Sequence, residues 1–233
     1  MIYPLLARAR GSSSRLLVPE NLGVCIYLKS LGLFQLLQDS GVEVDDRGIY
    51  DRQDPQLVVP LTRFDTEFDA EQVTNEADEA LRGSGLGSAN LYSVVTNTFA
   101  ELALNAVQHS ESPLGAYGFI QFYDSPRGRR FVCGVADGGI GVRRSLEKNP
   151  QVRNRVPYDW VALELAVRER VSGTLEPTRG MGLFGVAEEI RKTDRQLILH
   201  SGLGLLWISE DMQSEARRTK LFPGTLAYAS IPS

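Results

Sequence analysis

Residues 89–110 read ANLYSVVTNTFAELALNAVQHS, and this stretch decides the fold. Apolar side chains recur three and four positions apart along it, which is the spacing of one face of an α-helix. They are Leu91, Val95, Phe99, Leu102 and Ala106. The stretch is therefore predicted to be a long helix whose apolar face lies in the core of the protein.

The same helix carries polar side chains beside its apolar stripe. Glu101, Asn105 and Gln108 stand at i, i+4 and i+7, so they lie along one face. A carboxylate and an amide oxygen one turn apart can hold a water molecule and Mg²⁺ side by side, because this ion prefers oxygen ligands and takes others from phosphates and water. The alternative is that Glu101 and Asn105 only solvate the exposed face of a core helix.

Two strands are predicted next, over 117–123 and 130–136, joined by the hairpin turn Ser125-Pro126-Arg127-Gly128. The second strand leads directly into Asp137-Gly138-Gly139-Ile140-Gly141. This order places a carboxylate at a strand end, where glycines let the backbone approach a ligand closely. Taken alone, the segment also fits an ordinary Asp-Gly turn.

A third segment, Thr178-Arg179-Gly180-Met181-Gly182-Leu183-Phe184-Gly185-Val186, places two glycines at the start of an apolar helix predicted to end near residue 192. Free N–H groups and the positive end of the helix dipole favour phosphate at such a position. Glycines also open helices for conformational reasons alone, so this segment gains meaning only from its place after the other two.

The remaining elements follow from the same patterns. A helix over 4–10, a strand over 16–18 and an amphipathic helix ending near residue 39 predict a small α/β unit in residues 1–56. A strand over 57–61 and a helix over 69–82 precede the long helix, and another helix is expected near 159–171. Strands over 196–200, 205–208 and 225–231 follow.

Composition limits the classes of partner. The 29 acidic and 25 basic residues are well mixed, which argues against a nucleic-acid surface or a polybasic membrane anchor. Cys25 and Cys133 each lie in an apolar run, which favours buried free thiols. The first residues are too short for a signal-peptide core and no stretch approaches a membrane span, so the sequence predicts a cytoplasmic protein.

These segments together resemble the histidine-kinase-like (GHKL) ATPase superfamily, over residues 57–233. Glu-x-x-x-Asn on a helix, Asp-x-Gly-x-Gly after a strand, Gly-x-Gly-Leu opening a helix and a closing strand that begins Gly224-Thr225 occur in the family's order. The resemblance implies a Bergerat-type α/β sandwich, a mixed and mostly antiparallel sheet with helices on one face. It also implies an ATP lid over 142–179 that orders over triphosphate.

The resemblance implies roles for single residues. Asn105 would ligate Mg²⁺, Asp137 would accept a hydrogen bond from the adenine amino group, and Glu101 would act as general base. The other positions expected to contact or shape the nucleotide site are Gly139, Gly141, Arg179, Gly180, Gly182, Leu183 and Thr225. Many kinases of this type carry Lys three residues after the Mg²⁺ asparagine. Gln108 stands there instead, which removes one phosphate-neutralising charge.

The chain is most similar to stand-alone bacterial ATP-binding domains akin to histidine kinases and anti-sigma serine kinases. This similarity implies a regulatory protein kinase or slow ATPase in bacterial signalling, with ATP, Mg²⁺ and a protein partner or phospho-acceptor. The alternative is an ATP-dependent conformational switch without phosphoryl transfer; a homodimer is left open. Residues 16–37 resemble the last strand and helix of a STAS-like domain, and otherwise form a local α/β extension packed on the ATPase sheet.

Overall fold

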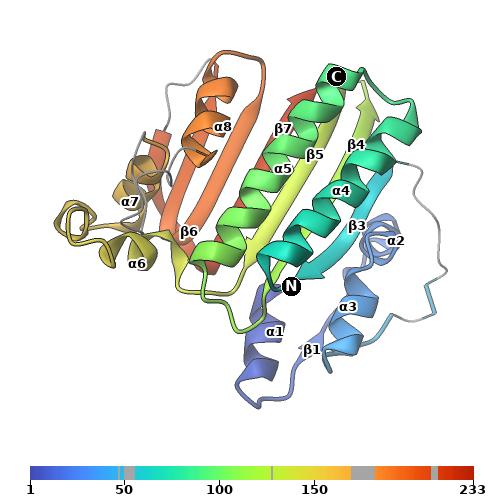
Figure 1. The fold of residues 1–233 in the computed structure, drawn as a ribbon. Helices are drawn as coiled ribbons and strands as arrows, with labels where there is room; N and C mark the ends of the chain where they lie inside the picture. Colours follow the sequence, from blue (N-terminus) through green and yellow to red (C-terminus); the bar gives the residue numbers. More distant parts are fainter. Residues whose placement is uncertain (47, 50–55, 127, 169–181, 211–214) are drawn as a thin grey trace.

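The computed structural model describes residues 1–46, 48–49, 56–126, 128–168, 182–210 and 215–233 (Figure 1). Within these ranges the chain is an α/β sandwich, which confirms the predicted fold class. Its main sheet has the strand order β3-β4-β5-β7-β6, and every neighbouring pair in it is antiparallel. The strands are β3 (Leu57–Phe64), β4 (Ala116–Ser125), β5 (Gly128–Asp137), β6 (Gln196–Ser209) and β7 (Glu215–Pro232).

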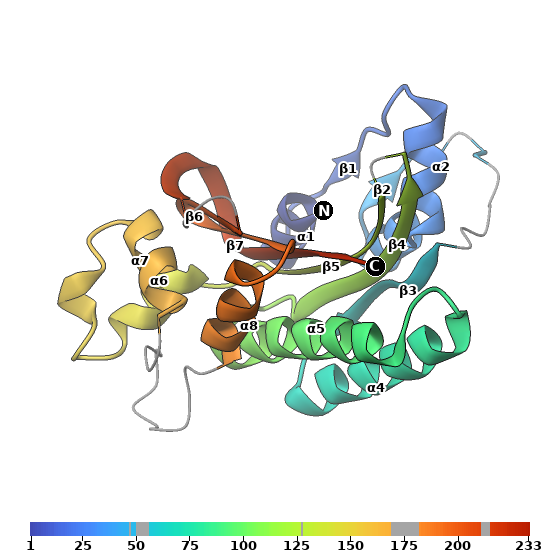
Figure 2. The ribbon, with the colours of Figure 1, turned by 90° about the horizontal axis from the view of Figure 1, so that it is seen from above.

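One face of the sheet is covered by three helices (Figure 2). They are α4 (Glu67–Ser84), α5 (Ala89–His109) and α8 (Gly182–Arg191). Ser88 caps α5 by accepting a hydrogen bond from the Leu91 N–H, and the Thr66 and Asp69 side chains form a reciprocal capping box at the start of α4. The main core lies between this layer and the sheet, and it contains the predicted apolar face of α5, including Val95, Phe99 and Leu102.

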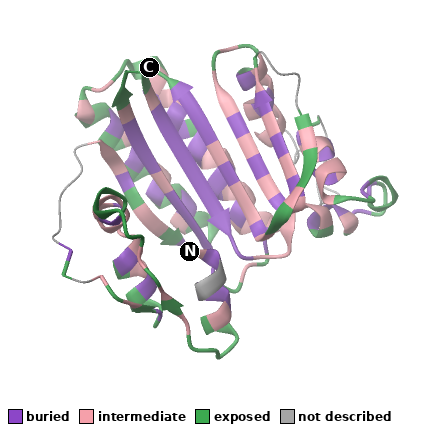
Figure 3. Cartoon of the chain, turned by 180° about the vertical axis from the view of Figure 1, so that it is seen from behind, coloured by how far each residue is buried: buried purple, intermediate pink, exposed green. Residues whose placement is uncertain are grey.

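The opposite face of the sheet carries the N-terminal unit (Figures 2 and 3). Its elements are α1 (Ile2–Ala9), β1 (Arg15–Leu16), α2 (Leu22–Ser30), α3 (Leu33–Asp39) and β2 (Glu43–Val44). β1 and β2 form a small parallel sheet. The single amphipathic helix predicted after residue 21 is two helices, because Gly32 between them has φ 87°, a left-handed conformation that glycine adopts without steric cost.

Between β5 and α8 lies a compact helical piece made of α6 (Gly141–Glu147), a 3₁₀ turn (Arg153–Arg155) and α7 (Asp159–Ala166). It has a small apolar core of its own that includes Leu146, Val156 and Leu165. Asp159 fastens it to the sheet, since its carboxylate accepts the Leu203 N–H at 2.8 Å. Residues 142–168 of the predicted lid therefore form folded structure, and the rest of the lid lies outside the described residues.

None of the helices in the described part of the chain combines the length and the hydrophobicity needed to cross a membrane.

Candidate functional site

The Asp137 carboxyl group lies at the end of β5 and is only 2% exposed. Its Oδ1 accepts two backbone hydrogen bonds, from the Gly139 N–H at 2.8 Å and from the Thr225 N–H at 3.2 Å. The second bond joins β5 to β7 across 88 residues of chain. Oδ2 has no hydrogen-bond partner among the described residues, so one acceptor of this buried group remains open.

Burial dominates the electrostatics of this group. It raises the pKa of Asp137 to about 6, against the lowering effect of the Gly139 and Thr225 N–H groups. Oδ2 can accept a hydrogen bond, and a ligand N–H group could supply it.

Three glycines bring backbone segments close around Asp137. A methyl group at Gly139 would overlap the Ser110 carbonyl, and one at Gly224 would overlap the Asp137 carbonyl. Gly141 has φ 79°, which allows the chain to turn from β5 into α6. The glycines at 139 and 141, predicted to line the site, therefore permit close approach at the first position and the turn at the second.

Ser201 was missed by the sequence analysis, although it ties this region together. Its hydroxyl donates to the Gly224 carbonyl at 2.8 Å and accepts the Val142 N–H at 2.9 Å, with Thr225 Oγ1 3.3 Å away. The residue is 2% exposed. It therefore joins the start of α6 to β6 and β7, on the side of the site next to Thr225.

Replacing Ser201 with alanine should lower the free energy of unfolding by about 1–3 kcal/mol, because it leaves a partly buried N–H and a buried carbonyl without their shared partner. Denaturant unfolding of the variant beside wild type measures this. Ser93→Ala is the control, since within the described part of the chain the Ser93 side chain bonds only to a carbonyl of its own helix, that of Ala89. Equal stability of the two variants would contradict a linking role for Ser201.

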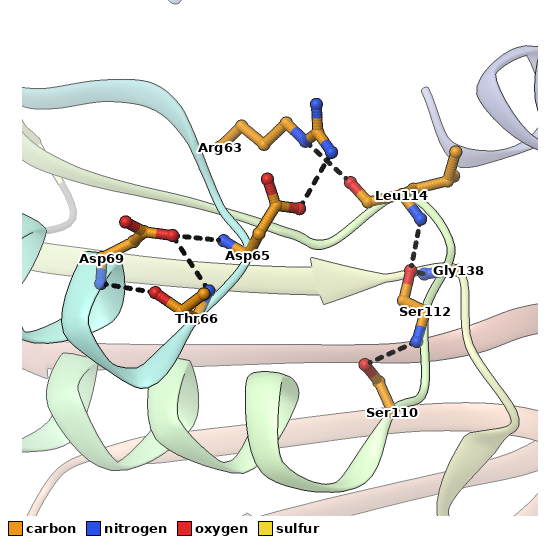
Figure 4. Close-up of polar contacts among 8 residues, drawn as sticks. All are labelled: Arg63, Asp65, Thr66, Asp69, Ser110, Ser112, Leu114 and Gly138. Atoms are coloured by element: carbon orange, nitrogen blue, oxygen red, sulfur yellow. Dashed lines mark hydrogen bonds and ion pairs between the residues drawn. The ribbon is translucent and has the colours of Figure 1, made fainter.

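The turn between α5 and β4 holds the other side of the Asp137 segment (Figure 4). Ser112 Oγ accepts the Gly138 N–H at 3.3 Å and the Leu114 N–H at 3.2 Å, and the Ile140 N–H donates to the Ser110 carbonyl at 2.7 Å. The Asp137–Gly141 segment is therefore bonded to the end of α5. Arg63 on β3 reaches the same turn through the Leu114 carbonyl at 3.0 Å.

Asn105 lies on α5, about 7.5 Å along the helix axis before Ser110. Its amide nitrogen donates to the Glu101 backbone carbonyl at 2.6 Å. Its Oδ1 has no hydrogen bond to any described residue, so it is available as a ligand oxygen. No cluster of three or more His, Cys, Asp or Glu side chains suited to a metal occurs in the described residues. A cation at Asn105 would therefore take most of its ligands from a bound molecule and water.

The Glu101 carboxylate lies against the first residue of α8. A methyl group at Gly182 would overlap it, so glycine leaves the space that this carboxylate occupies. Partial burial raises the pKa of Glu101. The structure thus brings Glu101 and Gly182 together where α5 and α8 pack side by side (Figure 1), and Asn105 lies one turn after Glu101 on α5.

The other predicted site residues divide into two groups. Leu183 lies in the first turn of α8 and packs partly buried against the main core. Arg179 and Gly180 lie outside the described residues.

No model of a known protein family matches the chain, and no curated protein matches it either.

Proposed function

We propose that the chain binds ATP with Mg²⁺ and acts as a regulatory protein kinase or slow ATPase in bacterial signalling. The observation that carries the proposal is the Asp137 carboxyl group, which is buried with one oxygen open. The adenine amino group is a donor of the kind that this oxygen lacks. Thr225 supports the arrangement, because its N–H fixes the other carboxyl oxygen.

The triphosphate would lie between Asn105 and the start of α8. Glycine at 182 places no side chain at the start of α8, and no acidic residue of this helix lies in its first turn; the Glu101 carboxylate of α5 packs beside Gly182. Mg²⁺ bound at Asn105 Oδ1 would neutralise charge on the phosphate oxygens.

Glu101 is the proposed general base. Its raised pKa makes it a stronger base than an exposed glutamate, and its carboxylate lies beside the α8 N-terminus. It would take the proton of a protein hydroxyl or of water. That oxygen would bond to the γ-phosphorus as the bond to the β–γ bridging oxygen breaks, and ADP would leave.

Calorimetric titration with ATP, ADP and GTP, each with and without Mg²⁺, tests the site. Saturable binding of both adenine nucleotides is expected, with GTP at least about tenfold weaker because guanine presents a carbonyl where adenine has its amino group. Absence of binding to the folded protein would sink the proposal.

Asn105→Ala is expected to bind ATP in Mg²⁺ only as well as wild type does in EDTA, because the variant lacks the ligand oxygen. Alanine is a strong helix former, so α5 should stay intact. The measurement is the ATP dissociation constant with Mg²⁺ and with EDTA. Asn97→Ala, on the exposed side of the same helix, is the control. A Mg²⁺ effect of wild-type size in Asn105→Ala would place the cation elsewhere.

A further inference from the structure

Helix α1 of the N-terminal unit packs directly against the segment that carries Asp137. A methyl group at Gly138 would lie 3.0 Å from Leu114 Cδ1, 3.2 Å from Leu6 Cδ2 and 3.4 Å from Ile2 Cγ2. Ile2 and Leu6 are buried in one apolar cluster with Leu114 and Ala136. The segment therefore contacts the end of α5 and also α1. Figure 2 shows these two helices on opposite faces of the sheet.

The packing of α1 against the chain favours glycine at position 138. Unlike Gly141, Gly138 does not have a positive φ, so its backbone conformation is open to other residues. In the Asp-x-Gly-x-Gly pattern position 138 is one of the two variable positions. A methyl group at 138 would be in tight contact with Leu6, Ile2 and Leu114, so these side chains would have to move by a few tenths of an ångström; glycine lets α1 pack closely here.

A shift of Gly138 would also move the Asp137 carboxyl group, because Gly138 is its covalent neighbour and the next N–H is hydrogen-bonded to it. The Gly138 N–H is held by Ser112 Oγ at 3.3 Å, and the next N–H, of Gly139, donates to Asp137 Oδ1 at 2.8 Å. Loss of the apolar support beneath Gly138 would loosen both bonds. The orientation of the open Oδ2 depends on the second of them.

α1 is joined to the rest of its unit. It shares a core with Leu37 of α3 and with Val42. The unit is fastened to the sheet by the Leu61 N–H, which donates to the Leu31 carbonyl at 2.9 Å, and by Tyr27, whose hydroxyl donates to Gln121 Oε1 at 2.8 Å. A force that moved this unit along the sheet would therefore also move α1 relative to Gly138.

We propose that residues 1–46 are a regulatory element of the Asp137 site: α1, when seated under Gly138, holds the Asp137–Gly141 segment in its nucleotide-binding conformation, and unseating α1 weakens nucleotide binding. The inference rests on the proposed function. It places the control of the site in α1, on the face of the sheet opposite α5 and α8. Because coupling between sites is reciprocal, bound nucleotide should also stabilise the seated α1.

The test compares Leu6→Ala and the milder Leu6→Val with Leu81→Ala. Leu81 is fully buried in α4, in the main core on the other side of the sheet, so its truncation removes a leucine side chain without touching α1. Two quantities are measured at a temperature where all variants are folded. They are the dissociation constant of Mg·ADP and the hydrogen-exchange rates of the amides of 138–142.

Both Leu6 variants are expected to weaken Mg·ADP binding, by about fivefold for Leu6→Ala, and to speed exchange at 138–142, while Leu81→Ala does neither. Saturating Mg·ADP should slow exchange in α1 of wild type. Equal effects of Leu6→Ala and Leu81→Ala on both quantities would overturn the proposal, since general loss of stability would then explain them.

The two proposals fail in different ways. If wild type binds no nucleotide, the proposed function fails, and exchange at 138–142 still reports whether α1 supports the segment. If wild type binds Mg·ADP and the Leu6 variants bind it equally well, the regulatory role fails and the proposed function stands.

Discussion

Replacing Asp137 with asparagine is expected to abolish detectable ATP binding while making the protein more stable at neutral pH. Both bonds from Gly139 and Thr225 go to Oδ1, which the asparagine amide oxygen can accept equally well. The amide nitrogen then takes the place of the open Oδ2. It would face the adenine amino group donor to donor, so ATP should bind at least about 100-fold more weakly.

The stability gain follows from the pKa of Asp137, which is raised from 3.8 to about 6 in the folded protein. Between these values the folded state keeps a proton that the unfolded state loses, so this group's contribution to stability falls as the pH rises through the window. Above pH 6 the ionised, buried carboxyl group lowers the free energy of unfolding by a constant amount of about 3 kcal/mol. Asparagine has no such cost.

Denaturant unfolding at several pH values from 4 to 7.5 measures the effect. The free energy of unfolding of Asp137→Asn minus that of wild type should increase between about pH 4 and pH 6 and then level off. Asp124→Asn, which changes the same charge at an exposed position, is the control. A difference that does not vary with pH would contradict a buried, titrating Asp137.

The helices and strands whose apolar residues recur at regular spacing could be predicted from sequence. α5 was expected over 89–110 from five apolar residues at helical spacing and ends at His109, and the structure adds the Ser88 cap at its start. The hairpin of β4 and β5 was likewise confirmed, each strand extending slightly beyond its predicted range. In these elements local propensity and burial agree.

β6 shows where local patterns fail. Two strands were predicted, over 196–200 and 205–208, whereas the chain forms one strand, 196–209, with register shifts at Gly202 and Gly204. Glycine is needed at both positions because a methyl group at either one would overlap Asp159 or the neighbouring backbone of α7. The need for glycine comes from a helix more than forty residues earlier, which no local window contains.

The candidate site also contains some residues that the sequence could identify and others that it could not. Asp137 and its glycines could be identified, since a carboxylate followed by glycines after a strand leaves a local signal. Ser201 could not, because a serine inside an apolar strand looks the same whether its hydroxyl links three segments or none. Gly138 was assigned no role, because its contacts with Leu6 and Leu114 exist only once the N-terminal unit has packed on the sheet.

Glu101→Gln is expected to reduce phosphoryl transfer or ATP hydrolysis by about 10²–10⁴-fold while leaving ATP affinity near the wild-type value. Glutamine keeps the size of the side chain beside Gly182 but cannot take a proton. The measurement is single-turnover ADP formation at saturating ATP, with the dissociation constant determined in parallel. Glu79→Gln, exposed on α4, controls for the change of charge.

The same variant separates a catalyst from a switch. At the proposed phosphate site, Gln108 stands where many kinases of the histidine-kinase-like type carry Lys, and one cation fewer would favour slow chemistry or none. If wild type and Glu101→Gln form ADP equally slowly and partner binding by both still depends on ATP, the general-base role fails and the nucleotide acts by occupancy alone. If turnover collapses only in Glu101→Gln, the carboxylate beside α8 takes part in the chemistry, and its raised pKa is then a functional property of the site.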